Sequence, residues 1–292
     1  MTVRYRIPIT AITVFGTSSL LAITVVIALY LGFSQAAEST RKQLAGRANT
    51  LIDSMEQSLD ARLAPIRDQA RWVAQDINNL SDPSSLDAYM FGSLSAAPQV
   101  AGIAVISTTG SGRRWHRDKR LAIDEDWSRK SWLQDYLKQV ETADSPTWRE
   151  PIFTEAVSSS TLLHDVPLRD ADGKFIGIFA QIVTLSELSS FLGREHAETG
   201  ITPFVLYNRD FVLAHPGLDT GTEQQPLQRL DETGDQILQR IWSPDETDPF
   251  ISRELVNTNA SGIFWGNTFY LFLHRDIESY GPAPWTIGAY LN

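Results

Sequence analysis

Residues 160–185 decide the fold class, and they read STLLHDVPLRDADGKFIGIFAQIVTL. The two ends of this stretch, 160–168 and 175–185, are typical of strands because apolar, β-branched and aromatic residues dominate them. Asp172 and Gly173 lie between the two ends. An Asp-Gly pair supplies the positive φ that a tight hairpin turn needs. The stretch therefore predicts two antiparallel strands joined by a turn.

Further strands and helices are expected on both sides of this hairpin. Strands joined by short turns, with helices on one side of the sheet, form an α+β domain of the PAS-like kind. We place this first module at residues 81–195. Its other expected elements are strands at 100–107, 113–118 and 148–153 and helices at 86–97, 127–142 and 187–194.

A second, smaller module of the same kind is expected at residues 196–292. The segment 217–228 is rich in Gly, Gln and Pro, which is typical of a loop. The fold class is therefore α+β, with two PAS-like antiparallel-sheet modules. The expected elements of the second module are strands at 204–207, 211–214, 262–265, 268–274 and 284–291 and a helix at 235–242.

Residues 7–33 contain no charged side chain. As a helix this run would be roughly 40 Å long, enough to cross a bilayer core of about 30 Å, so we expect a transmembrane helix. Arg4 and Arg6 precede it, and the positive-inside rule then places residues 1–6 in the cytoplasm. A cleaved signal peptide is the alternative, but the apolar run is about twice the usual length. Either reading exports the rest of the chain, and we expect the periplasmic side of a bacterial inner membrane.

A long stalk helix is expected at residues 38–80, because apolar residues recur there at spacings of three and four. Pro65 should bend this helix or break one turn of it. The first half could pair with a copy of itself, so we expect a homodimer. Neither an output domain nor a second membrane span follows the second module, and the chain is expected to be a piece of a longer receptor.

Composition and motifs exclude several classes of function. A formal charge of -10 argues against a nucleic-acid binder, and the lack of Cys excludes thiol catalysis and Cys-ligated zinc. No motif typical of serine hydrolases, phosphate loops, zinc proteases or dinucleotide-binding folds is present. The five His are far apart, so no metal site and no cofactor is expected. Hydrolysis by a pair of carboxylates remains an alternative.

Aromatic and polar side chains are dense in the first module. Buried indoles need an acceptor for the N–H group, which makes them common in pockets with one polar wall. Packing in the core is the alternative for each ring. A Lys close to several Trp could hold a ligand carboxylate in a charge-assisted bond. The candidate ligand-binding residues are Trp115, Trp127, Lys130, Trp132, Tyr136, Trp148, Phe153 and Glu155.

Several short motifs follow one another in the first module: DWSRKSW at 126–132, WREPIF at 148–153, VPLRDADGKFIG at 166–177 and the segment 185–192. Their order resembles the membrane-distal module of double Cache sensor domains, and the likeness extends over roughly residues 38–292. The resemblance implies an extracytoplasmic receptor for small molecules, as found in bacterial chemoreceptors, histidine kinases and nucleotide cyclases. Parts of the second module are similar to regions that precede adenylate/guanylate cyclase domains.

The resemblance also implies which positions contact the ligand, and here the sequence departs from the family. Lys130 and Leu133 replace an Arg and an aromatic residue that grip carboxylates, and Ile182 replaces an Asp that takes an ammonium group. An apolar side chain cannot compensate a buried ammonium. We therefore expect a carboxylate without an amine, or a neutral solute. The alternative is a module for dimerisation or protein contact with no small ligand.

Overall fold

The computed structural model describes residues 9–77, 83–143, 145–155, 157–218, 221–243, 253–255 and 258–292. The chain divides into two units, residues 1–50 and residues 51–292. The first unit is helical from residue 9 onward, and the second contains both sheets.

The structure forms these elements in chain order: α1 (Ile9–Ile77), α2 (Pro83–Ala96), β1 (Gly102–Ser107), β2 (Ser111–His116), β3 (Leu121–Asp126), α3 (Leu133–Glu141), β4 (Thr147–Trp148), β5 (Ile152–Thr154), β6 (Ser159–Arg169), β7 (Phe175–Thr184), α4 (Leu185–Thr199), β8 (Thr202–Tyr207), β9 (Phe211–Ala214), β10 (Gln228–Arg229), the 3-10 turns η1 (Leu230–Glu232) and η2 (Leu238–Arg240), β11 (Arg253–Leu255), β12 (Thr258–Trp265), β13 (Thr268–Ile277) and β14 (Trp285–Leu291).

The expected transmembrane and stalk helices fall within one element, α1. Residues 1–8, which include the start of the expected transmembrane helix, and the last part of the expected stalk, 78–80, lie outside the described residues. In the part of the chain that the structure describes, no helix combines the length and apolar composition that a membrane crossing requires. The transmembrane helix expected at 7–33 is therefore not supported by the structure. Pro65 lies inside α1 without ending it.

The hairpin expected at 160–185 is confirmed as β6 and β7. Gly173 adopts a φ of +81°, and its N–H donates to the carbonyl oxygen of Asp170 at 3.0 Å. The Asp170 side chain accepts a further bond from the N–H of Lys174 at 2.9 Å. The turn is thus wider than the tight hairpin turn that Asp172-Gly173 suggested, because the Asp170 carboxylate organises it.

The first sheet has the strand order β3-β2-β1-β7-β6-β4, with β5 also paired to β6. Strand β3 was not expected. The helix expected from Trp127 begins only at Leu133. The reason is a turn: the side chain of Asp126 accepts from the N–H of Ser128 at 2.9 Å, and the N–H of Trp127 donates to the carbonyl oxygen of Gly110 at 2.8 Å. These bonds hold the start of the segment against the β1–β2 turn.

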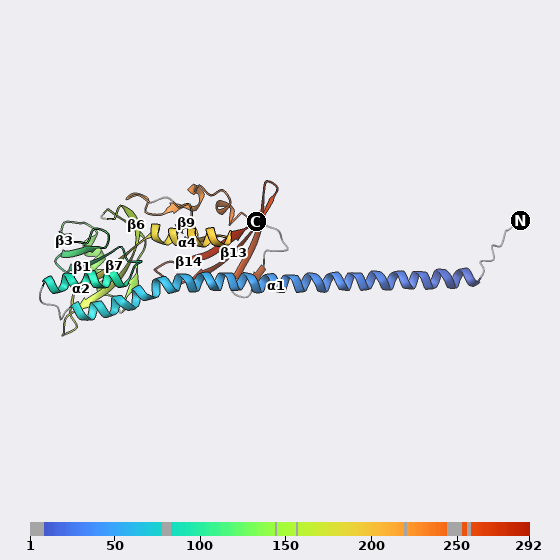
Figure 1. Ribbon diagram of the computed structural model, residues 1–292, viewed down its shortest axis with the longest axis horizontal. Coiled ribbons are helices and arrows are strands. Elements are labelled where there is room, and N and C mark those ends of the chain that lie inside the picture. The colour runs from blue at the N-terminus through green and yellow to red at the C-terminus, as the bar shows by residue number, and fades with distance from the viewer. Residues whose placement is uncertain are drawn as a thin grey trace. The chain divides into compact units, whose positions relative to one another are not determined.

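Helices cover the first sheet on both faces. We call the first the α3 face, because Ala104 on β1 and Ala180 on β7 share a core there with Leu133, Tyr136 and other α3 residues. We call the opposite one the α1–α2 face. There, Gln181 of β7 bonds to Gln69 of α1, and Trp115 of β2 bonds to Asp87 of α2. Figure 1 shows α1 and α2 running beside β1 and β7. The expectation of helices on one side is wrong, because the long helix also packs on this sheet.

The second sheet has the order β10-β9-β8-β14-β13-β12-β11. The helix expected at 235–242 is reduced to the 3-10 turn η2, where Oδ1 of Asp235 accepts the N–H groups of Ile237 and Leu238 at 2.9 and 3.0 Å. Strand β12 begins at Thr258, four residues earlier than expected. Residues 219–220 of the expected loop lie outside the described residues.

From residue 51 onward, α1 packs against both sheets. Its apolar stripe is buried, as the spacing predicted, and includes Ile52, Leu59, Leu63, Ile66 and Ala70. Polar contacts accompany this stripe at both modules. Arg275 on β13 contacts Glu56 at 2.8 Å, the Tyr280 hydroxyl donates to Asp60 at 2.5 Å, and Gln181 donates to Gln69 at 3.0 Å.

Candidate ligand-binding site

Two of the predicted residues lie on the α1–α2 face of the first sheet. Trp115 is fully buried, and its indole N–H donates to Oδ1 of Asp87 at 2.8 Å. Trp148 is buried against His164, with the ring centroids 4.7 Å apart. Both rings therefore pack beneath the helices α1 and α2, away from the α3 face.

Four other predicted residues enclose no common cavity. Lys130, Trp132 and Glu155 are exposed, Trp132 by 47% of its surface. Phe153 is half-buried on β5, at the edge of the sheet. The position that the family resemblance assigned to carboxylate binding, Lys130, thus lies at the surface.

Trp127 and Tyr136 are the two predicted residues that meet on the α3 face. Trp127 packs against the core cluster that contains Tyr136. Its ring lies over Gly112, where a Cβ atom would come within 2.7 Å of the ring and 2.1 Å of the Val105 carbonyl oxygen. Gly112 is therefore required for the close approach of Trp127 to β2. Trp132 contacts the edge of the Tyr136 ring from outside, with centroids 5.6 Å apart.

Two charged residues that were not predicted, Arg149 and Asp165, contact Tyr136. The Tyr136 hydroxyl donates to Oδ1 of Asp165 at 2.9 Å. The Arg149 guanidinium lies over the Tyr136 ring, 4.3 Å from its centroid, and its Nε is 3.6 Å from Oδ2 of Asp165. Arg149 also donates to the side chain of Gln139 at 2.7 Å. We call Tyr136, Arg149 and Asp165 the ionic cluster.

Electrostatics in the ionic cluster are set by burial. The Asp165 side chain is 0% exposed, and burial raises its pKa to about 7 against the opposing effects of Arg149 and the Tyr136 hydrogen bond. Burial, and next the charge of Asp165, also raise the pKa of Tyr136 well above its ordinary value. A carboxylate with such a pKa can hold or release a proton near neutral pH.

Sequence reasoning did not single out Asp165 or Arg149. A signal for Asp165 existed, because an ionisable residue within an apolar, β-branched strand is seldom buried without a partner. Arg149 lies in the WREPIF motif, but the motif does not show which face of the sheet its side chain reaches. Alternation along β4 sends Trp148 to one face and the next residue to the other.

A different set of polar side chains is buried on the α1–α2 face. The side chain of Gln181 donates to that of Gln69 at 3.0 Å, and Gln69 donates to the carbonyl oxygen of Ser93 at 2.7 Å. His164 lies beside them, and burial lowers its pKa to about 4, so the ring is neutral at physiological pH. These groups connect β6 and β7 to α1 and α2.

Several hollows lie near the first sheet. A polar cavity of about 320 Å³ includes His116, Lys119, Ser159 and Glu187 but none of the eight predicted residues. A hollow of about 670 Å³ includes Trp115 and lies on the α1–α2 face. Residues 78–82, which connect its α1 and α2 walls, are outside the described residues, and no site is assigned there.

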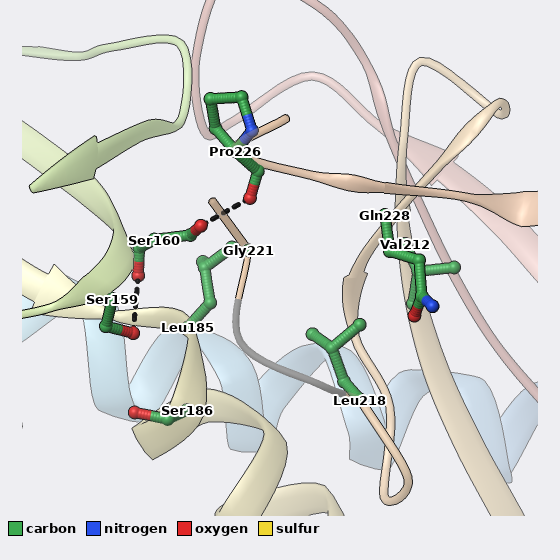
Figure 2. Close-up of a pocket in the computed structure, with 9 residues that line it drawn as sticks. All are labelled: Ser159, Ser160, Leu185, Ser186, Val212, Leu218, Gly221, Pro226 and Gln228. Carbon is green, nitrogen blue, oxygen red and sulfur yellow. Dashed lines mark hydrogen bonds between the residues drawn. The ribbon is translucent and has the colours of Figure 1, made fainter. Parts of the chain in front are cut away.

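A third cavity lies where the two modules meet. Figure 2 shows Ser159, Ser160 and the start of α4 on one side and Gly221 and Pro226 on the other. The Ser160 hydroxyl donates to the Pro226 carbonyl oxygen, and a Cβ on Gly221 would come within 2.2 Å of that hydroxyl. With about 20 Å³ the cavity has room for about one water molecule, so it cannot hold a metabolite.

Metal-ligating side chains are dispersed in the described part of the chain. No group of three or more His, Cys, Asp or Glu side chains is arranged there to hold a metal ion.

In the second module, Nε2 of His215 lies 3.0 Å from Oδ2 of Asp235, which also accepts from the Tyr290 hydroxyl. Although burial opposes it, these two partners lower the pKa of Asp235 to about 2. The carboxylate is therefore a fixed acceptor that joins three segments.

The architecture matches solved ligand-binding domains of bacterial chemoreceptors. For the Pseudomonas fluorescens chemoreceptor CtaA in complex with L-leucine, the TM-score is 0.61 at 16% identity, covering 87% of this chain and 97% of that one. The chain shares their fold. For the sensory domain of the Campylobacter jejuni chemoreceptor Tlp3, the TM-score is 0.62 at 10% identity, covering 87% of this chain and 95% of that one. For the Pseudomonas aeruginosa amino acid chemoreceptor PctC in complex with GABA, the TM-score is 0.54 at 16% identity, covering 85% of this chain and 97% of that one.

At the level of sequence the chain matches no family model and no curated protein. The fold expected from the double Cache resemblance is nevertheless confirmed by these structures. Their similarity gives no support to the narrower likeness with regions preceding adenylate cyclase domains. None of the three is an enzyme by its description.

The expectation of a ligand without an amine needs correction. The solved neighbours were obtained with L-leucine, L-serine and GABA, which carry both an amine and a carboxylate. The expectation rested on Ile182 as the position for a compensating carboxylate. Register places Ile182 opposite Leu163, and Asp165 follows two residues later on the same face of β6. A carboxylate is thus present one strand away, where the sequence motif did not point.

Proposed function

We propose that this chain is the extracytoplasmic small-molecule-sensing part of a bacterial transmembrane receptor, with its ligand bound on the α3 face of the first module. The observation that carries this proposal is the ionic cluster, in which Asp165 is fully buried and paired with Tyr136 and Arg149. Burying a carboxylate is costly, and a fold used for ligand binding in its neighbours provides a reason to do so. The fold similarity over 87% of the chain supports the same function.

Ligand binding would be transmitted through α1. From residue 51 onward this helix contacts the first module through Gln69 and the second through Glu56 and Asp60. A ligand that prefers one arrangement of the sheet would change the position of the helix against both modules. Two copies of α1 that pair in a homodimer would carry this change toward the membrane.

Membrane attachment and output are expectations that the sequence supports. The uncharged run at 7–33 with Arg4 and Arg6 before it supports an anchor with the bulk of the chain in the periplasm. A nucleotide cyclase is the proposed output, and a chemoreceptor or a histidine kinase is the alternative. Fusing a periplasm-sensitive reporter after residue 292 and after residue 6 would test the orientation.

A ligand-free interaction module is the second candidate, and one observation favours it. The α3 face is filled by its own side chains, because Leu133, Leu137 and Val140 are all at most 6% exposed. Such packing suits a domain whose task is dimerisation. It also suits a sensor whose helix α3 moves when the ligand enters.

Thermal unfolding of the full chain with a panel of metabolites distinguishes the two candidates. A ligand at about 100 times its Kd should raise the Tm by roughly 5 °C, because binding to the native state stabilises it by about 2.7 kcal/mol. The interaction module predicts no shift of the Tm with any compound. A panel of amino acids, organic acids, amines and sugars without any shift would overturn the sensor proposal.

A further inference from the structure

The strands β12 and β13 of the second sheet end in an exposed aromatic hairpin. Residues 263–265 pair with residues 268–270, and a two-residue turn joins them. Gly266 takes the first position of this turn with a φ of +61°, a conformation that a tight hairpin turn requires and that Gly adopts without strain. Phe264 is 58% exposed and Trp265 is 37% exposed. We call residues 263–270 the hairpin tip.

The hairpin tip projects beyond the neighbouring strands. On one side, the pairing of β14 with β13 ends at Leu271. On the other side, β11 pairs with β12 only at residues 258–260. The tip is therefore two strands wide, and neither neighbouring strand covers its aromatic side chains.

The charges around the hairpin tip suit an anionic bilayer surface. Residues 255–273 contain no charged side chain, although 21% of the chain is charged and the formal charge is -10. A carboxylate near anionic lipids is repelled, and any charge is costly to bury in a bilayer. The guanidinium of Arg240 lies over the Trp265 ring, 4.0 Å from a ring centroid. Indole rings lie at the level of the lipid headgroups, and cations near them attract anionic lipids.

The direction of β13 shows which end of the second module carries the hairpin tip. Arg275 on β13 bonds to Glu56 of α1 at 2.8 Å. Five residues later, Tyr280 bonds to Asp60 at 2.5 Å. The two segments therefore run in the same direction, and α1 reaches the first module only at Gln69. The start of β13, with the hairpin tip, thus lies at the end of the second module that faces away from the first.

The second module is also the module nearest in sequence to the uncharged run 7–33. Residues 34–50 separate this run from the part of α1 that packs on the second module, and these helical residues span only about 25 Å. With the run anchored in a bilayer, this short connection keeps the second module close to the membrane surface.

We propose that the hairpin tip docks on the surface of the bilayer, with Phe264 and Trp265 in the headgroup region and Arg240 beside anionic lipids. This inference rests on the membrane anchor of the proposed function. The contact holds the second module at the membrane, so that α1 moves against a fixed support. A bilayer fits this surface better than a protein does, because two aromatic side chains of about 150–250 Å² each fall short of the roughly 800 Å² per partner that a stable protein interface buries.

The chain contains no Cys, so a fluorescent label can be placed at a single introduced thiol. Asn267→Cys places it on the turn of the hairpin tip, in the full chain reconstituted into vesicles of phosphatidylethanolamine and phosphatidylglycerol. Lipids that carry a nitroxide near the headgroup quench the label by contact. We expect loss of fluorescence at this position in nitroxide vesicles. A label at Asp124→Cys, at a side chain of the first module that is 77% exposed, should show no loss.

A second pair of variants tests the aromatic side chains. In the labelled Asn267→Cys chain, Phe264→Ser together with Trp265→Ser should remove the quenching, because the apolar surface that enters the headgroup region is gone. Both positions are exposed, so the fold is retained. Trp132→Ser is the matched control: it removes a Trp of the first module that is 47% exposed and should leave the quenching unchanged.

A third label, at Tyr30→Cys within the uncharged run, separates this inference from the anchor. Quenching at Tyr30→Cys without quenching at Asn267→Cys would leave the anchor standing and overturn the docking of the hairpin tip. If neither label is quenched, both fall. A label at Asn267→Cys that moves to shorter emission wavelength without quenching would indicate contact with protein, such as a second copy of the chain, and would equally overturn docking on lipid.

Discussion

Replacing Asp165 with Asn should change how stability depends on pH. In the folded chain the pKa of this buried carboxyl is raised from 3.8 to about 7. Between these values the folded chain holds a proton that the unfolded chain has released. Rising pH therefore favours unfolding, and the stability linked to Asp165 is full below about pH 4 and is lost as the pH rises to about 7.

The magnitude follows from the size of the shift. Each pKa unit corresponds to about 1.4 kcal/mol, so a rise from 3.8 to about 7 corresponds to on the order of 4 kcal/mol across this window. The side chain is fully buried, so solvent does not screen the effect. The free energy of unfolding of Asp165→Asn, relative to the parent chain, should increase by this amount from pH 4 to pH 7.

Urea titrations of both proteins at several pH values measure this difference. His164 and His274 act in the opposite direction, because burial lowers the pKa of each to about 4 and their stability is lost as the pH falls below about 6.5. Both histidines are present in parent and variant, so subtraction removes them. A difference that is independent of pH, or that falls as the pH rises, would refute the raised pKa.

Three further changes test other parts of the fold. Gly112→Ala should lower the free energy of unfolding by about 1–3 kcal/mol in urea, because the new Cβ meets both the Trp127 ring and a strand carbonyl. Tyr280→Phe should cost about 1–2 kcal/mol and speed hydrogen exchange in α1 around Asp60, whose carboxylate loses a 2.5 Å bond; unchanged exchange there would contradict the contact. Asp235→Asn should destabilise the chain at neutral pH and have less effect as the pH falls from about 4 to 2, because the folded-state pKa is about 2 and the stabilisation is lost in that window.

The sequence predicted the elements that depend on local pattern. The β6–β7 hairpin and the buried stripe of α1 follow from periodicity and turn chemistry, and both are present. The helix predicted to start at Trp127 starts later because of a long-range bond. The N–H of Trp127 donates to the carbonyl oxygen of Gly110, and strands β2 and β3 lie between these two residues in the sequence. Local propensity cannot show such a bond, because it depends on the β1–β2 turn being formed first.

The candidate site was harder to predict for a related reason. The aromatic residues chosen from the sequence come from both faces of the first sheet, since Trp115 and Tyr136 lie on opposite sides. The face of a residue follows from register, and register depends on which strands pair. Arg149 and Asp165 meet only because β4 and β6 are paired. Their partnership is therefore a property of the fold and not of any motif.

The shortness of β4 has a mechanical consequence. It forms the edge of the first sheet and consists of Thr147–Trp148, extended by a bond from the N–H of Arg149 to the carbonyl oxygen of Leu163 at 2.9 Å. Trp148 lies 6.2 Å from the Tyr280 ring, and the Tyr280 hydroxyl bonds to Asp60 on α1. Adjacent residues of a strand point to opposite faces of the sheet. Any displacement of Arg149 on one face would therefore also displace Trp148 on the other, and with it the ring contact to Tyr280 beside the long helix.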